Sequence, residues 1–158
     1  MWQRKQTVFL VVAALMALAT WFFPVVTYEH AGAEFTFRTT GLFMADGTEV
    51  VDVDIKVPFS IVLTVIAVAL LACALLYGNR PRQIRFLRGT YLVILAVIAF
   101  LFITDNSLRS YLGRNGGEVT DTFGVAYFLP LLTLVFAYLA ERAIRADEAL
   151  VRSADRLR

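Results

Sequence analysis

Side chains able to bind a metal ion gather in the first long polar segment of the 158-residue chain. Glu29, His30, Asp52 and Asp54 all belong to residue types that ligate zinc or harder cations. The two aspartates, however, alternate with valines, which is typical of the hydrated face of a strand, and a single histidine in a loop is usually hydrated. We therefore expect neither a metal ion nor a cofactor.

A second set of charged side chains lies in the polar segment that follows the third apolar run. Its members are Asp105, Arg109, Glu118 and Asp121. Their spacing does not show whether they meet, so an enzymatic site built from them remains an alternative. The neighbouring glycine-rich residues 113–117 are not followed by Lys-Ser/Thr and do not join a strand to a helix, so we expect a turn there and no phosphate-binding loop.

The composition is that of a membrane protein. Hydrophobic residues make up 59% of the chain, against roughly 45–50% in soluble domains, and a water-soluble fold could not cover so much apolar surface. The net charge of +2 is small and the basic residues flank apolar runs, so no nucleic-acid partner is expected. Cys73 lies inside an apolar run. Because it is the single cysteine, an intramolecular disulfide is excluded.

Four apolar runs approach the length that a transmembrane helix requires, about 20 residues for a hydrocarbon core of roughly 30 Å. They are residues 7–26, 58–77, 87–104 and 122–140. The predicted fold is therefore an all-α membrane protein, a bundle of four transmembrane helices with a small extracytoplasmic antiparallel sheet between the first two. Pro24 and Pro130 predict kinks in the first and fourth helices.

The interiors of these four runs hold no ionisable side chain. Such a residue would cost at least about 2.5 to 3.5 kcal/mol and would mark a proton pathway or a catalytic site. Its absence argues against a proton pump, an intramembrane protease and a metal-dependent enzyme. We therefore expect no catalytic residue and no enzymatic activity.

The distribution of basic residues predicts the orientation, because cytoplasmic loops carry an excess of Lys and Arg. Arg4 and Lys5 precede the first run, and the linker between the second and third runs carries Arg80, Arg82, Arg85 and Arg88. Both polar segments on the other side are acidic. We predict cytoplasmic N and C termini, and the four linker arginines could also contact anionic lipid headgroups.

The N-terminal run has a second interpretation as a cleavable signal peptide. Arg4 and Lys5 are followed by an apolar stretch that ends in Ala17-Leu18-Ala19, a small-residue pattern suited to cleavage. The apolar run continues to Val26, longer than the roughly 7 to 15 residues of a signal core. N-terminal sequencing separates the two, since cleavage would leave Thr20 as the first residue.

Alternating apolar and polar residues predict strands within the outer segment 28–57. We expect a three-stranded meander over residues 33–39, 41–45 and 48–56. The Asp46-Gly47 pair is a strong signal for a two-residue type I′ hairpin turn, which requires a positive φ at both positions.

The C-terminal segment 141–158 is predicted to continue the fourth helix into the cytoplasm. Glu141/Arg145 and Glu148/Arg152 have the i, i+4 spacing of stabilising ion pairs. The segment also carries a narrow apolar stripe, formed by Leu150, Ala154 and Leu157. Such a stripe could dock on the bundle, lie on the membrane surface or contact a partner helix.

Both ends of the chain resemble those of a known family. Met1, Gln3-Arg4 and Gln6-Thr7 at the start, and residues 147–158 at the end, are similar to a family of four-span membrane proteins of Bacteroidota known as domain of unknown function 4293. The resemblance implies an inner-membrane location and no particular activity. The outer segment with Gly41-Leu42-Phe43 also resembles a claudin-like arrangement, although the paired cysteines of claudins are missing.

The functional expectation is a non-enzymatic accessory or scaffold subunit of an inner-membrane assembly. Its protein partners would bind the outer sheet and the tail, residues 141–158. The alternative is a binder or carrier of lipid or another small hydrophobic ligand, held between the kinked first and fourth helices.

Overall fold

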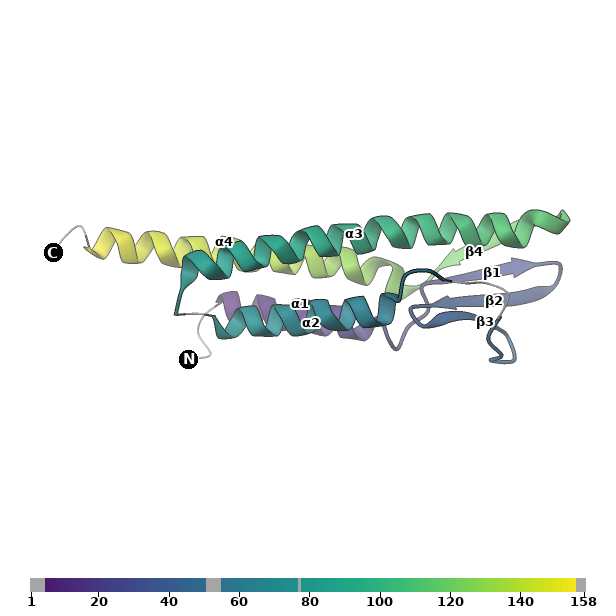
Figure 1. Cartoon of the computed structure of the whole chain (residues 1–158), viewed down its shortest axis with the longest axis horizontal. Helices are drawn as coiled ribbons and strands as arrows, with labels where there is room; N and C mark the ends of the chain where they lie inside the picture. The colour runs from purple at the N-terminus through teal and green to yellow at the C-terminus, as the bar shows by residue number, and fades with distance from the viewer. Residues whose placement is uncertain (1–4, 51–54, 77, 156–158) are drawn as a thin grey trace.

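The computed structural model describes residues 5–50, 55–76 and 78–155. Figure 1 shows an elongated molecule in which helices lie alongside one another and a small sheet lies toward one end. Helix α1 (Lys5–Ala19) begins and helix α4 (Val125–Asp155) ends far from the sheet (Figure 1). The two ends of the molecule therefore differ in secondary structure, since one is helical and the other contains the sheet.

The helices are α1 (Lys5–Ala19), α2 (Phe59–Leu75), α3 (Arg80–Leu112) and α4 (Val125–Asp155). Helix α1 packs against α2 and α4, and α3 packs against α2 and α4. Asn79 caps α3, since its side chain accepts the Arg82 backbone N–H at 3.3 Å. Pro81 lies in the first turn of α3. Backbone N–H groups there have no partner within the helix, so the N–H that proline lacks is not missed and the helix can begin at this position.

The sheet contains β1 (Val26–His30), β2 (Ala33–Arg38), β3 (Gly41–Met44) and β4 (Val119–Phe123) in the order β3-β2-β1-β4. All neighbouring strands are antiparallel. Strand β4 arrives from the connection between α3 and α4, after the short 3-10 helix η1 (Gly113–Asn115). The sheet therefore combines two segments that lie far apart in the sequence.

The strand register separates an apolar face from a polar face. Val26 lies opposite Phe37 and Phe123, and Tyr28 lies opposite Phe35 and Asp121. Because side chains alternate along a strand, these residues share the face that meets the helices. The other face carries polar side chains in register across the strands, namely Thr27, Thr36, Thr122, Glu29, Glu34 and Thr120.

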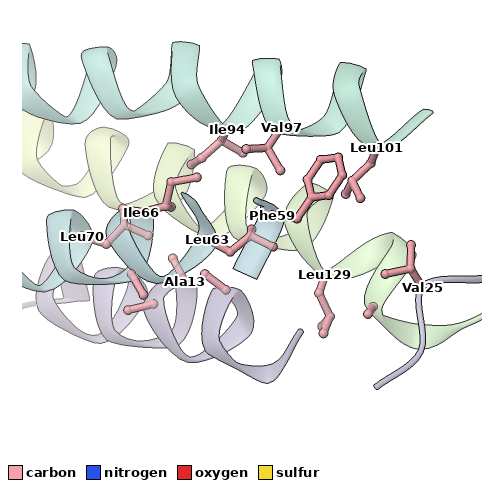
Figure 2. Packing of buried hydrophobic residues seen from close by; sticks show 14 of the residues in the cluster. Ala13, Val25, Phe59, Leu63, Ile66, Leu70, Ile94, Val97, Leu101 and Leu129 are labelled. Carbon is pink, nitrogen blue, oxygen red and sulfur yellow. The ribbon is translucent and has the colours of Figure 1, made fainter. Parts of the chain in front are cut away.

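One apolar core runs from the helices into the sheet. In Figure 2 the labelled side chains of α3, Ile94, Val97 and Leu101, lie on the side of that helix that faces the other helices. Small residues bring α1 and α4 close together, because Ala13 and Ala137 are both fully buried and the Thr133 hydroxyl lies 3.5 Å from the Ala13 carbonyl oxygen.

The predicted bundle of four transmembrane helices is wrong. Within the described residues, two helices are long and apolar enough to cross a membrane by length and composition, α3 with 33 residues and Val125–Ala149 of α4 with 25. Helix α1 has 15 residues and α2 has 17, which at 1.5 Å per residue span about 22 and 25 Å, less than a typical hydrocarbon core. The fold is also not all-α, since it includes the four-stranded sheet.

The error arose because apolar runs are shared between helices and strands. Within residues 7–26 the helix ends at Ala19, and Val26 already belongs to β1. Within residues 122–140, Phe123 belongs to β4 and the helix begins at Val125. Conversely, α3 extends well beyond residues 87–104 in both directions, so the expected basic linker and part of the expected acidic loop are helical.

Two of the predicted strands lie where the alternation placed them, as β2 and β3. The described part of segment 48–56 forms only an isolated bridge between Glu49 and Phe43, and residues 51–54 lie outside the described residues. The type I′ pattern of positive φ occurs instead at Ala31 and Gly32, the two-residue loop between β1 and β2. At the predicted position the turn is held by the Asp46 carboxylate, which accepts the Thr48 N–H at 2.9 Å.

Helix α4 continues through the predicted tail as far as Asp155. The expected i, i+4 ion pair between Glu141 and Arg145 is present. The side chains of Arg152 and of the apolar stripe Leu150, Ala154 and Leu157 lie outside the part of the chain whose side chains are described.

Candidate functional site at the junction of the sheet and helix α3

A buried hydrogen bond joins the centre of the sheet to α3. The Tyr28 hydroxyl donates to Oδ1 of Asp105 at 2.6 Å, and both side chains are buried. Burial raises the pKa of the Tyr28 phenol well above its usual value, and the hydrogen bond to Asp105 raises this pKa further. Tyr28 therefore stays protonated and remains a donor to the carboxylate.

An ion pair lies next to this hydrogen bond. Arg109 is one helical turn beyond Asp105, and Asp121 lies opposite Tyr28 in the register of β1 and β4. Nη1 of Arg109 is 3.3 Å from Oδ1 of Asp121. The Arg109 side chain is 55% exposed and that of Asp121 is 17% exposed, so the cation faces solvent. Helix α3 thus contacts both β1 and β4 through polar groups.

A polar groove of about 550 Å³ opens beside the ion pair. It is lined by Arg109, Gly113 and residues 117–121. Of the four charged residues considered as a possible enzymatic site, three line the groove: Arg109, Glu118 and Asp121. The fourth, Asp105, lies one helical turn from Arg109 and accepts the hydrogen bond from Tyr28. The groove offers one cation and two carboxylates, which suits it to bind a polar group that carries both signs of charge.

The predicted metal-ligand types lie at the tip of the sheet. Glu29 faces Glu34 across β1 and β2, and both border a hollow of about 390 Å³ with His30. Nδ1 of His30 is 3.5 Å from the Glu118 carbonyl oxygen. Within residues 5–50, 55–76 and 78–155, no three His, Cys, Asp or Glu side chains come together as a metal site would require. Asp52 and Asp54 lie outside the described residues.

A second polar cluster lies at the opposite end of the helices. Glu141 is buried and pairs with Arg88 at 3.1 Å as well as with Arg145. Nη1 of Arg80 donates to the Asp147 carbonyl oxygen at 3.2 Å. Arg80 and Arg88 therefore hold α3 against α4, whereas Arg82 and Arg85 are exposed.

The sequence pattern did not predict the burial of Asp105 and Glu141, because each lies one residue past an apolar run. Asp105 follows the run that ends at residue 104, and Glu141 follows the run that ends at residue 140. Extending the alternation of the outer segment back to Val26 would have placed Tyr28 on the apolar face of a strand.

The described residues form the helices α1 to α4 and a four-stranded antiparallel sheet, and two of these helices are long and apolar enough to cross a membrane. They define a small α+β protein in which a sheet with a polar outer face is attached to an apolar helical body. A family model described as "Domain of unknown function (DUF4293)" matches residues 2–157, and the chain belongs to this family. The resemblance of the chain ends to that domain is thereby confirmed. Comparison with curated proteins and with solved structures found no match.

Proposed function

We propose that this protein is an integral membrane protein whose α3 and α4 cross the inner membrane, and that it acts as a non-enzymatic accessory or scaffold subunit. Its sheet would stand on the outer side as a rigid contact surface. The proposal rests on two features together. The helices expose a large apolar surface, and the sheet, whose outer face is polar, is attached to them by a hydrogen bond and an ion pair.

Exposed apolar side chains support the membrane position. Only 28% of the apolar window of α3 and 39% of that of α4 are buried, whereas the core helix of a soluble protein would be mostly buried. Large apolar side chains point outward along both helices, including Leu92, Leu95 and Phe102 on α3 and Phe128, Leu131 and Val135 on α4. A lipid environment would cover this surface without further protein.

The positions of charged and aromatic residues support the orientation. At the helical end Lys5, Arg82, Arg85 and Arg142 are exposed. The sheet end carries more exposed acidic residues, namely Glu29, Glu34, Asp46, Glu49 and Glu118, beside the exposed Arg38, Arg109 and Arg114. This asymmetry favours a cytoplasmic position for both termini. Exposed aromatic side chains mark the boundary between helices and sheet, as expected at a membrane interface: Trp21, Phe22, Phe23, Phe123 and Phe128.

The attachment of the sheet supports the scaffold role. Tyr28 to Asp105 and Arg109 to Asp121 connect α3 with two neighbouring strands. The chain also passes directly from β4 into α4, and the Gly124 N–H donates to the Val25 carbonyl oxygen at 2.8 Å. A sheet held at this many points would present its polar face in a fixed orientation, which a contact surface requires.

Site-specific photo-crosslinking in living cells tests this role. A benzoyl-phenylalanine at Thr122, on the outward polar face, is expected to give a defined protein adduct that co-purifies in mild detergent. The same probe at Leu92, on the lipid-facing surface of α3, is the matched control and should give no such adduct. Absence of any protein adduct at Thr36, Glu29 and Thr122, together with a monodisperse monomer after purification, would contradict the scaffold role.

The membrane position has its own test. Extraction of membranes at alkaline pH should leave the protein in the pellet. Release into the supernatant would contradict the proposal that α3 and α4 cross the bilayer.

The alternative function, a lipid binder, is supported by the groove beside Arg109 and not by a site between the first and fourth helices, where the sequence predicted one. The α1–α4 contact is filled by buried Ala13, Ala17 and Ala137. The groove beside Arg109 is where a headgroup could enter.

A further inference from the structure

We infer that the groove beside Arg109 binds a phosphoethanolamine group, with the phosphate on Arg109 and the ammonium on Glu118 and Asp121. The inference goes beyond a contact surface, and it rests on the proposed membrane position for the argument about depth.

The depth of the groove matches the headgroup layer. The last large apolar side chains exposed on α3 before the groove are Phe102 and Ile103, and the next exposed positions, from Asn106 to Ser110, are polar. Arg109 lies six residues beyond Ile103, about 9 Å along the axis. Helical side chains lean toward the N-terminus of their helix, which in α3 is the apolar part. The guanidinium therefore reaches back into a headgroup layer that is about 5 to 8 Å thick.

The Arg109 guanidinium has more N–H donors than its ion pair uses. In the ion pair Nη1 of Arg109 lies 3.3 Å from Oδ1 of Asp121, and a guanidinium has five N–H donors. With its side chain 55% exposed, the outer edge of this group is open to the groove. A phosphate can bind there in the bidentate manner that arginine favours, without breaking the contact to Asp121.

The carboxylates select the second half of the ligand. Glu118 is exposed and Asp121 half-buried, and both line the same groove as Arg109. Two carboxylates against one guanidinium leave an excess of negative charge, which disfavours a purely anionic ligand. A primary ammonium a few ångströms from a phosphate offsets this excess and donates hydrogen bonds, which a trimethylammonium cannot do. The volume of about 550 Å³ lies within the range of small-ligand pockets.

Native mass spectrometry of the full chain in detergent tests the inference. Phosphatidylethanolamine, phosphatidylglycerol and phosphatidylcholine with identical acyl chains are offered in equal amounts. We expect phosphatidylethanolamine to be retained about tenfold more strongly than the other two, as for one charge-assisted hydrogen bond. Arg109→Gln and Glu118→Gln should abolish this preference. Arg114→Gln and Glu49→Gln are matched controls, because both residues are exposed but lie outside the groove lining, and they should keep it.

Free phosphoethanolamine separates the two sources of the ligand. Displacement of the lipid by millimolar free phosphoethanolamine would show that the headgroup alone is recognised, and persistence of a selective lipid adduct would show that the acyl chains also contribute. Both results support the site.

Equal retention of the three lipids would overturn the inference, and so would an unchanged preference in Arg109→Gln and Glu118→Gln. Glu118→Gln is nearly isosteric and exposed, so folding is preserved even where Arg109→Gln fails. A protein that stays in alkaline-extracted membranes but shows no preference overturns this inference alone. Release from the membranes counts against the proposed function.

Discussion

The Tyr28 hydroxyl lies 2.6 Å from Oδ1 of Asp105 and joins a central strand of the sheet to the longest helix. Both residues are buried, and the carboxylate would be costly to bury without a donor. The bond therefore fixes where along α3 the sheet is placed. It also places Arg109 one turn further on, within reach of Asp121 on β4.

Removing the Tyr28 hydroxyl should destabilise the protein measurably. Tyr28→Phe keeps the ring but leaves the buried Asp105 carboxylate without this donor, and we expect a loss of about 1 to 3 kcal/mol in the free energy of unfolding. The measurement is denaturant unfolding in a mild detergent, followed by circular dichroism. Tyr138→Phe is the control, because Tyr138 is exposed, and its effect should stay within about 0.5 kcal/mol. Equal effects of the two variants would contradict a structural role for the bond.

Stability should depend on alkaline pH through Tyr28. The folded protein raises the pKa of this phenol, whereas in the unfolded chain the pKa is near 10. The folded state therefore keeps a proton that the unfolded state loses, so the stabilisation is complete below about pH 10 and falls as pH rises further. The advantage of wild type over Tyr28→Phe should shrink by up to about 1.4 kcal/mol per pH unit above pH 10. An advantage that is constant from pH 8 to pH 11 would show that Tyr28 does not contribute this dependence.

Two glycines should respond in opposite directions to alanine. A Cβ at position 124 would overlap the carbonyl oxygen of Pro24 and lie 2.8 Å from its carbonyl carbon, where β4 meets α4. Since both obstacles are backbone atoms, Gly124→Ala should cost more than about 2 kcal/mol. Gly89 lies inside α3 with no atom within 4 Å of its added Cβ, so Gly89→Ala should stabilise by about 0.5 to 1 kcal/mol. Thermal unfolding midpoints of the two variants give the comparison, and a tolerated Gly124→Ala would refute the close approach.

Thiol labelling should reveal opposite exposure of the two ends of the molecule. Cys73, the single native cysteine, is buried and should not react in the folded protein. In intact cells with a permeable outer barrier, Thr122→Cys should react with a membrane-impermeant maleimide. Arg142→Cys should react only after the inner membrane is opened. Wild type is the control for reaction at Cys73, and labelling of both added thiols from the same side would contradict the proposed orientation.

Local patterns were sufficient for part of the fold. Alternation over Phe35 and Phe37 predicted β2, and i, i+4 spacing predicted the Glu141 to Arg145 pair, because both depend on neighbours in the sequence. Hydropathy located the apolar parts of α3 and α4 for the same reason.

Other features depend on contacts that no local pattern contains. Val26 and Phe123 lie in apolar runs whose hydropathy predicts helix, and strand pairing makes them strand residues: Val26 pairs with Phe37 and Phe123, and Phe123 pairs with Val26. The groove arises because that pairing brings Asp121 to Arg109. Asp105 looked like a loop residue for a similar reason, since its burial is produced by a strand from the other half of the chain.

The late arrival of β4 has a consequence for synthesis. Strands β1 to β3 emerge from the ribosome early, yet one edge of β1 pairs with β4, which follows α2 and α3 in the chain. Until then that edge has unpaired N–H and C=O groups, a template for unwanted strand addition. Synthesis thus includes an interval in which this edge of β1 is open, and the arrival of β4 ends it.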